Sequence, residues 1–223
     1  MDIKIDKIVR TKRKTIALQI TDDATLVVRA PFYVSDETIK RVVLRHKKWI
    51  ERKKSEIQKR DPKFSKKEFV NGEGFLYLGK SFKLAIVDGQ EVPLKLDDVF
   101  SLSKKYLPDA KQIFIKWYWQ KAYEKISERV NLYAQRFGYM YNKVRITNAQ
   151  KRWGSCSSKG NLNFSWRLVM APLPVIDYVV IHELVHLEVK NHSREFWHKV
   201  KMLMPDYALH RLWLRENGYM LRL

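Results

Sequence analysis

A cluster of histidines near the end of the chain is the clearest chemical feature of the sequence. Five of the six histidines lie between His182 and His210, and the first two belong to the pattern H-E-x-x-H at His182, Glu183 and His186. On a helix, residues four apart lie on the same face, so both imidazoles can reach one metal ion at about 2.0–2.1 Å. Glu183 can hydrogen-bond a water on that metal and act as general base. The pattern predicts a hydrolytic zinc site with Glu183 as its catalytic residue.

A catalytic zinc also needs a third protein ligand and one open position. We expect His192 to be this metal ligand. In a continuous helix it would lie about 15 Å from His182, so the chain must turn at Lys190-Asn191, where asparagine tolerates left-handed backbone. Glu195 and His198 are the rival ligands if a second helix completes the site. Otherwise both are ordinary surface residues.

The segment that carries H-E-x-x-H must form a mostly buried helix. Residues 175–187 are apolar nearly all round, and Pro174 and Asn191 mark its expected limits. Two ordinary buried histidines are the alternative interpretation of the pattern. Polar groups buried there without partners would destabilise the fold, and a metal ion with an enclosed water would relieve that cost.

A basic hairpin directly before this helix is the second candidate part of the site. From Lys143 to Ile176 there are six basic residues and no acidic one. Residues 154–161 are the expected turn, and the second arm alternates, with Leu162, Phe164, Trp166 and Leu168 on one face and polar residues on the other. We expect the substrate to contact Lys151, Arg152, Lys159, Asn161, Asn163 and Arg167.

The rest of the chain predicts an α+β fold. We expect short strands within residues 5–21 and 24–31, a helix from Ser35 to Arg60 stopped by Asp61-Pro62, and an antiparallel meander over residues 69–96. A long helix should run from Pro108 to Phe137 with Gly138 as C-cap, and an amphipathic helix should close the chain. Residues 1–100 are thus the expected β-rich basic N-terminal region with one helix, and residues 101–223 the catalytic domain.

Charge and composition restrict the partners. The chain has 44 Lys and Arg against 24 Asp and Glu, a formal net charge of +20 and a pI near 9.9. Such a field attracts polyanions, so we expect an anionic substrate, either a nucleotide or an acidic or nucleic-acid-associated protein. The one cysteine, Cys156, cannot form an internal disulfide, and no apolar run of about 18 residues exists. We expect a cytoplasmic protein without a membrane span, in which Cys156 is a turn residue or, alternatively, caps the zinc in a latent form.

The chain resembles a known family over residues 145–218. RWGSCSSKGNLNFSWRLVMAP followed by YVVIHELVHLEVKNHSREFW resembles the YgjP-like metal-dependent hydrolases, which are grouped with the zincin peptidases. The spacing H-E-x-x-H-x5-H and the trailing Phe-Trp are also similar to WLM and SprT-like domains. The resemblance implies a zincin-like catalytic domain, a small mixed sheet plus the H-E-x-x-H helix, with zinc at His182, His186 and His192 and with Glu183 catalytic. It leaves the substrate open, because the family includes members classed as peptidases and a UTP pyrophosphatase assignment, and WLM and SprT-like relatives cut proteins bound to DNA.

Three functions agree with these features. A zinc metallopeptidase would hold an extended peptide by strand addition along the second arm of the hairpin. A UTP pyrophosphatase, converting UTP to UMP and pyrophosphate, would use the basic hairpin residues to neutralise phosphates. A nucleic-acid-binding protein or DNA-associated protease would use the basic helix over residues 35–60, with Trp153 stacking on a base. The motif favours the metallopeptidase, with one Zn²⁺ or, alternatively, another divalent transition metal.

Overall fold

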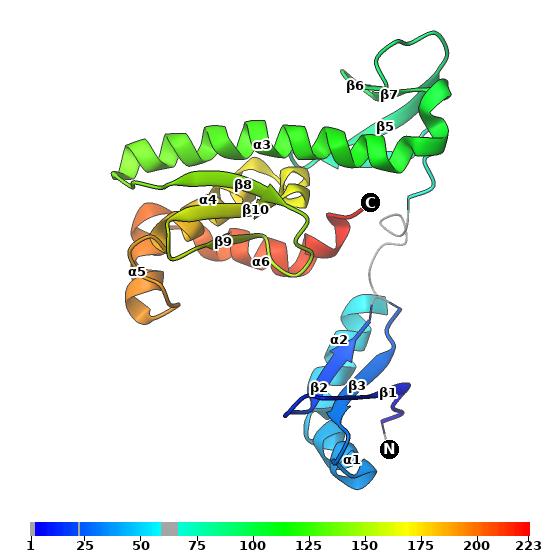
Figure 1. Cartoon of the computed structure of the whole chain (residues 1–223), viewed down its shortest axis with the longest axis vertical. Helices are drawn as coiled ribbons and strands as arrows, with labels where there is room; N and C mark the ends of the chain where they lie inside the picture. Colours follow the sequence, from blue (N-terminus) through cyan, green and yellow to red (C-terminus); the bar gives the residue numbers. More distant parts are fainter. Residues whose placement is uncertain (1–2, 22, 59–66) are drawn as a thin grey trace. The chain divides into compact units, whose positions relative to one another are not determined.

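One long helix, α3 (Ala110–Phe137), is the element on which much of the chain packs (Figure 1). Its end is as expected, because Gly138 follows it with φ 73°, the left-handed conformation that glycine adopts at helix C-termini. Its buried residues recur every four positions and form one stripe: Ala110, Phe114, Tyr118, Ala122, Ile126, Val130 and Ala134. This stripe is the spine of the larger hydrophobic core.

The structure is a computed structural model that describes residues 3–21, 23–58 and 67–223. It divides the chain into two compact units, residues 1–63 and 64–223. The larger unit thus includes residues 67–100, which the sequence pattern groups with the N-terminal region. The reason is aromatic packing: Phe75 stacks on Phe114 of α3 at 4.3 Å, and Phe100 meets Trp117 edge-on at 4.9 Å.

The strands expected as an antiparallel meander form a four-stranded mixed sheet instead. Its strands are β4 (Gly74–Tyr77), β5 (Lys80–Val87), β6 (Leu94–Leu96) and β7 (Phe100–Ser103), in the order β4-β5-β7-β6. The pairs β4–β5 and β6–β7 are antiparallel, whereas β5 and β7 run parallel. A 3-10 helix, η2 (Lys104–Asp109), then leads into α3. Gly79, at φ 80°, lies in the turn between β4 and β5. A Cβ atom on this residue would lie 2.8 Å from Pro172.

The basic segment after α3 forms a second sheet beside that helix (Figure 1). Its strands are β8 (Lys143–Thr147), β9 (Gly154–Cys156) and β10 (Asn161–Ser165), in the order β8-β10-β9. The turn of the hairpin is shorter than expected. The sequence pattern places Gly154–Cys156 in the turn, but these residues form a strand antiparallel to β10. Strand β8 pairs with β10 in parallel, and β10 ends at Ser165, where the 3-10 helix η3 (Trp166–Met170) begins.

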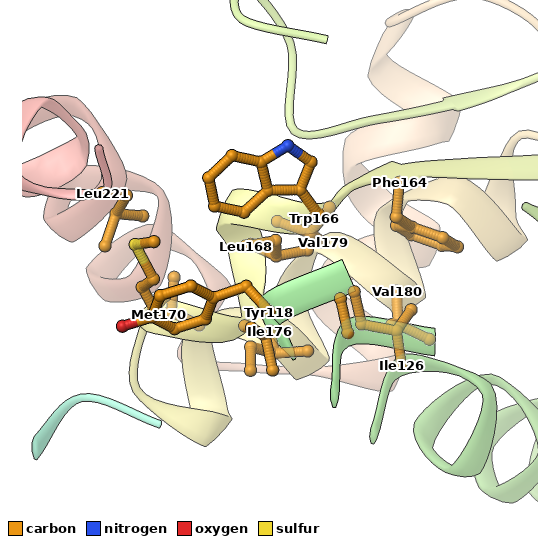
Figure 2. Packing of buried hydrophobic residues seen from close by; sticks show 14 of the residues in the cluster. Tyr118, Ile126, Phe164, Trp166, Leu168, Met170, Ile176, Val179, Val180 and Leu221 are labelled. Carbon is orange, nitrogen blue, oxygen red and sulfur yellow. The ribbon is translucent and has the colours of Figure 1, made fainter. Parts of the chain in front are cut away.

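Helix α4 (Leu173–Val185) crosses α3 and completes the core of this unit. Figure 2 shows side chains from α3, β10, η3 and α4 meeting in one cluster, among them Ile126, Phe164, Trp166 and Val180. Helices α5 (Arg194–Leu203) and α6 (Tyr207–Asn217) follow, and a last 3-10 helix, η4 (Gly218–Met220), ends at the buried Leu221. The amphipathic C-terminal helix is thus confirmed as α6.

The N-terminal unit has its own small core. Strands β1 (Lys7–Thr11), β2 (Ala17–Ile20) and β3 (Leu26–Pro31) form a sheet in the order β1-β3-β2. Alternate residues of β3 are fully buried against the helices of this unit, which contribute Ile39, Val43 and Ile50. The expected strand region 5–21 therefore contains two strands, of which β1 is parallel and β2 antiparallel to β3.

The single helix expected over residues 35–60 is two helices, α1 (Asp36–Arg45) and α2 (Lys47–Gln58). The N-cap prediction is confirmed, because Ser35 accepts a hydrogen bond from the backbone N–H of Thr38 at 3.2 Å. The break lies at His46, whose φ and ψ of −100° and 15° leave the helical region and whose Nδ1 lies 2.8 Å from the Val42 carbonyl oxygen. Arg60 and the expected stop at Asp61-Pro62 fall outside the described residues. None of the helices in the described ranges is both long and apolar enough to cross a membrane.

Candidate metal centre

Helix α4 presents two of the three histidines to one point. It is buried on almost every side, with Ile181, Leu184 and Val185 at 1% exposure or less, so its polar residues lie against the protein interior. His182 lies in its last turn, and His186 is its C-cap, so the two imidazoles lie on one face at a centroid distance of 4.9 Å. The i, i+4 spacing thus places both imidazoles on one face of the helix, as the sequence pattern predicts.

The third histidine returns because the chain reverses between α4 and α5. The α-helix ends at Val185, earlier than the expected limit at Asn191. Asn191 stabilises the turn with its side chain, because its Oδ1 accepts a hydrogen bond from the Ser193 N–H at 3.1 Å. Its backbone does not adopt the left-handed conformation that the sequence suggested. Ser193 then caps α5, where it accepts from the Phe196 N–H at 3.4 Å. This turn brings His192 back over α4.

The three imidazoles point their Nε2 atoms at one another. His192 Nε2 lies 3.0 Å from His182 Nε2 and 3.2 Å from His186 Nε2, and the ligand atoms all lie within 4.8 Å. Two nitrogens bound tetrahedrally to one metal ion at about 2.0–2.1 Å would be separated by about 3.3 Å, close to the two distances from His192 Nε2. Phe196 lies beneath all three rings, with centroid distances of 4.8, 4.4 and 4.8 Å.

The hydrogen bonds and the burial of the histidine rings also favour binding of a metal ion. His186 Nδ1 lies 2.9 Å from the Val189 carbonyl oxygen, so Nδ1 carries the proton and Nε2 keeps its lone pair. Burial lowers the pKa of His182 to about 3, with the neighbouring histidines adding to the effect, and burial likewise lowers the pKa of His192. With Nε2 unprotonated on each ring, three lone pairs would converge on one point, where a cation can lie between them. The donor set therefore fits a divalent transition metal.

Glu183 is a buried carboxylate beside these rings. It is 4% exposed, its Oε2 has no hydrogen-bond partner among the described residues, and burial raises its pKa to about 8. The charge of Arg152 and a backbone hydrogen bond from Cys156 lower the pKa in opposition to burial. The strand β9 reaches this carboxylate only because residue 154 is glycine: a Cβ atom there would lie 2.5 Å from Glu183 Oε1. This role of Gly154 was not expected, because the sequence pattern places this glycine in the hairpin turn.

The rival ligands do not join the cluster. Among the described residues, the group of potential ligands that converges is His182, His186 and His192. Glu195 and His198 lie on α5 and are exposed. Cys156 lies on β9 near Glu183, and its thiol contacts the Ser157 carbonyl oxygen at 3.5 Å. It does not belong to the histidine cluster.

A cavity of about 270 Å³ opens beside His182 and Glu183. Its other lining residues come from the segment before and into β9, from α4 and from α6: Arg152, Trp153, Gly154, Tyr178, Val179, Arg211 and Leu214. Arg211 and Tyr178 were not expected at the site. Nothing local in the sequence marks Arg211, because its position depends on α6 folding back against α4.

Of the six residues expected to contact substrate, Arg152 lines this cavity and the other five do not. Asn163 Nδ2 instead donates to the Ser155 carbonyl oxygen at 3.3 Å, and Asn161 Nδ2 to Ser157 Oγ at 3.2 Å, so both brace the hairpin. Arg167 stacks on Trp166 at 4.2 Å and donates to Asn148 Oδ1 at 2.8 Å. Lys151 and Lys159 lie exposed on the loops that flank β9.

Comparison with protein-family models identifies a metallopeptidase domain. The family model described as "YgjP-like, metallopeptidase domain" matches residues 14–217. Comparison with curated proteins gives no significant match. Among solved structures, the crystal structure of the metallopeptidase zymogen of Pyrococcus abyssi abylysin is 23% identical, covers 40% of this chain and 93% of its own, and has a TM-score of 0.36. Because the family model covers most of the sequence, the chain belongs to the YgjP-like metallopeptidase domain family.

Proposed function

We propose that this protein is a zinc-dependent metallopeptidase that uses Glu183 as general base. The observation that carries the proposal is the convergence of three Nε2 atoms, from His182, His186 and His192, beside a buried carboxylate. Three histidines leave one position of a tetrahedral zinc open, which is typical of catalytic and not of structural sites. When bound, the metal would polarise the scissile carbonyl and acidify a water molecule.

The residues of the chain supply the proton transfers and the orientation. Glu183 takes the proton of the attacking water at one carboxylate oxygen and delivers it to the nitrogen of the leaving amine. Its Oε2 is buried and has no hydrogen-bond partner among the described residues, so no other protein group there competes for this proton. The backbone contact with Cys156 and the close approach of Gly154 hold the carboxylate in place beside β9. The apolar walls of the cavity limit competing water.

Strand β9 offers the peptide a place to bind. In the sheet order β8-β10-β9, the central strand β10 is paired on both sides, whereas one edge of β9 has no partner strand among the described residues. An extended peptide that added to this edge would run along the strand that contacts Glu183. We therefore propose that the peptide adds to β9, the first arm of the hairpin, and not to the second arm that the sequence suggested.

UTP pyrophosphatase activity is the second candidate. Arg152 in the cavity wall favours it, because a guanidinium can bind phosphate oxygens in a two-pronged manner. The other basic residues of the hairpin do not line the cavity, so a phosphate chain would meet fewer cations than the sequence suggested. The peptidase therefore remains the better-supported proposal.

Two parallel assays separate the candidates. Denatured casein and each of the four ribonucleoside triphosphates are incubated with metal-loaded protein, alongside Glu183→Gln protein with equal metal content. We expect cleavage of casein that the substitution abolishes. Release of pyrophosphate from UTP that depends on Glu183, without cleavage of casein or any other protein in a panel, would overturn the peptidase proposal in favour of the second candidate.

A further inference from the structure

Two arginines flank the cavity beside the metal centre, and neither forms an ion pair with the described residues, although the charge of Arg152 acts on Glu183. Arg152 precedes β9, and Arg211 lies on α6, 29 residues after His182 in sequence. Both side chains line the same cavity as His182 and Glu183. Other arginines of this unit do have partners: Arg129 binds Asp177, and Arg215 lies 3.7 Å from Glu216. Within the described ranges, no carboxylate lies within ion-pair distance of either cavity arginine.

The guanidinium of Arg211 is held in place by aromatic stacking. It lies 4.5 Å from the ring centroid of Trp197, which in turn stacks on Tyr207 at 5.5 Å with an interplanar angle of 22°. Trp197 also stacks on His192 at 5.6 Å, so this aromatic group links Arg211 to a ligand of the metal centre. A stacked guanidinium loses little further freedom when it binds an anion, which favours tight binding.

The remaining walls of the cavity are uncharged. Trp153, Tyr178, Val179 and Leu214 contribute mostly apolar surface. Trp153 is itself fixed against Gly218, where a Cβ atom would lie 2.9 Å from its ring. Arg152 and Arg211 are themselves exposed, so a ligand reaches both guanidinium groups from the open side of the cavity. An uncharged substrate group would leave both guanidinium groups unpaired beside the cavity.

We propose, on the basis of the peptidase function above, that Arg152 and Arg211 form a subsite that binds a carboxylate of the peptide next to the scissile bond. The carboxylate belongs to an acidic side chain or to a free C-terminus. The volume of about 270 Å³ has room for an acidic side chain or a chain terminus.

Binding to the inactive, metal-loaded Glu183→Gln protein tests this subsite without requiring cleavage. Calorimetry would compare acetylated, amidated pentapeptides of alanine with a central Glu or a central Gln, and pentaalanine with a free or an amidated C-terminus. The first pair tests an acidic side chain and the second a terminal carboxylate. We expect one acidic member to bind about tenfold or more tightly than its neutral partner, which is typical of charge-assisted hydrogen bonds.

Matched variants assign the effect to the two arginines. Arg152→Gln and Arg211→Gln should each remove the preference for the acidic peptide, whereas Arg211→Lys should restore only part of it. Arg145→Gln on β8 and Arg215→Gln on α6 remove exposed arginines outside the cavity and should leave the preference intact.

Equal binding of acidic and neutral peptides, or a preference that survives in both cavity variants, would overturn the proposal. So would binding of UTP or inorganic pyrophosphate that depends on both arginines when no carboxylate peptide binds. The failure of the peptidase function would be distinct: wild-type protein would cleave no protein substrate, while acidic peptides still bound through Arg152 and Arg211.

Discussion

Gly154 on β9 and Glu183 on α4 lie so close that a single added methyl group would collide with the carboxylate. A Cβ atom on residue 154 would lie 2.5 Å from Oε1, 2.7 Å from Cγ and 2.9 Å from Cδ of Glu183. These contacts join the edge strand to the helix that carries the histidines. The position of Glu183, the proposed general base, thus depends on a residue without a side chain in a neighbouring strand.

Substitution of this glycine should therefore impair catalysis without removing the metal. Gly154→Ala must push Glu183 or β9 aside, and displacement by about 1 Å can cost roughly 100-fold in rate. We expect kcat to fall by about that factor while metal content stays at the wild-type value. Steady-state kinetics and elemental analysis of the same preparations check this. Gly89→Ala, where the added Cβ would have nothing within 4 Å but φ is 75°, adds a methyl group and backbone strain away from the site and should keep the wild-type kcat. Wild-type kcat in Gly154→Ala would show that the contact does not position the base.

Replacing the buried carboxylate should abolish activity but not the fold. Glu183 is 4% exposed, and burial holds its pKa near 8, so the site tolerates the charge poorly. Glu183→Gln keeps the shape and removes the ionisable group. Loss of a general base lowers kcat by about 10²–10⁴-fold. The urea midpoint of the metal-free variant should equal or exceed that of the metal-free wild type. A clearly lower midpoint would mean that the carboxylate stabilises the structure.

The metal-free protein should lose stability at acidic pH, because His182 is buried in the native state. Burial depresses the pKa of His182 to about 3, whereas an unfolded histidine has a pKa near 6.5. Below about pH 6.5, His182 therefore binds a proton in the unfolded chain but stays neutral in the native state. Stability should fall by up to about 1.4 kcal/mol per pH unit for this group until the pH approaches 3. Urea unfolding between pH 7.5 and 5 measures this slope. His182→Gln should flatten it, and His198→Gln, at an exposed position, should not. An unchanged slope in His182→Gln would contradict the assignment.

Removal of one partner of the ion pair that joins α3 to α4 should destabilise the protein. Arg129 Nε lies 2.6 Å from Asp177 Oδ1, and Nη2 lies 2.8 Å from Oδ2, while Asp177 is only 6% exposed. Removing one partner of a buried pair leaves the other charge uncompensated and costs about 3–5 kcal/mol. Asp177→Ala should lower the free energy of unfolding by about 3 kcal/mol. Asp97→Ala, which breaks the exposed pair with Lys95, should cost less than about 1 kcal/mol. Equal effects of the two substitutions would refute this view of the α3–α4 contact.

Features determined by local chemistry could be predicted from the sequence. Ser35 caps α1 and Gly138 caps α3 because each effect depends on a few neighbouring atoms. The alignment of His182 with His186 follows from helical geometry alone. His192 joins them as proposed, although the reversal uses the side chain of Asn191 and an early end of α4.

Features that depend on distant packing could not be predicted in this way. Gly154–Cys156 has the composition of a turn, and it becomes a strand because β10 pairs with it on one side and α4 packs against it. The parallel pairing of β8 with β10 has no local signal. Arg211 enters the cavity only because α6 returns to α4. The unit boundary near residue 63 likewise reflects the contact of Phe75 with Phe114, 39 residues apart in sequence.

The most direct test of this account is X-ray absorption spectroscopy of zinc-loaded protein with its zinc content measured in parallel. The account predicts one zinc ion per chain with three nitrogen ligands at about 2.0–2.1 Å. His192→Ala should lose one of these nitrogens and bind zinc more weakly, because this residue completes the group of three Nε2 atoms. A wild-type protein that binds no zinc, or a His192→Ala spectrum identical to that of the wild type, would contradict the proposed centre.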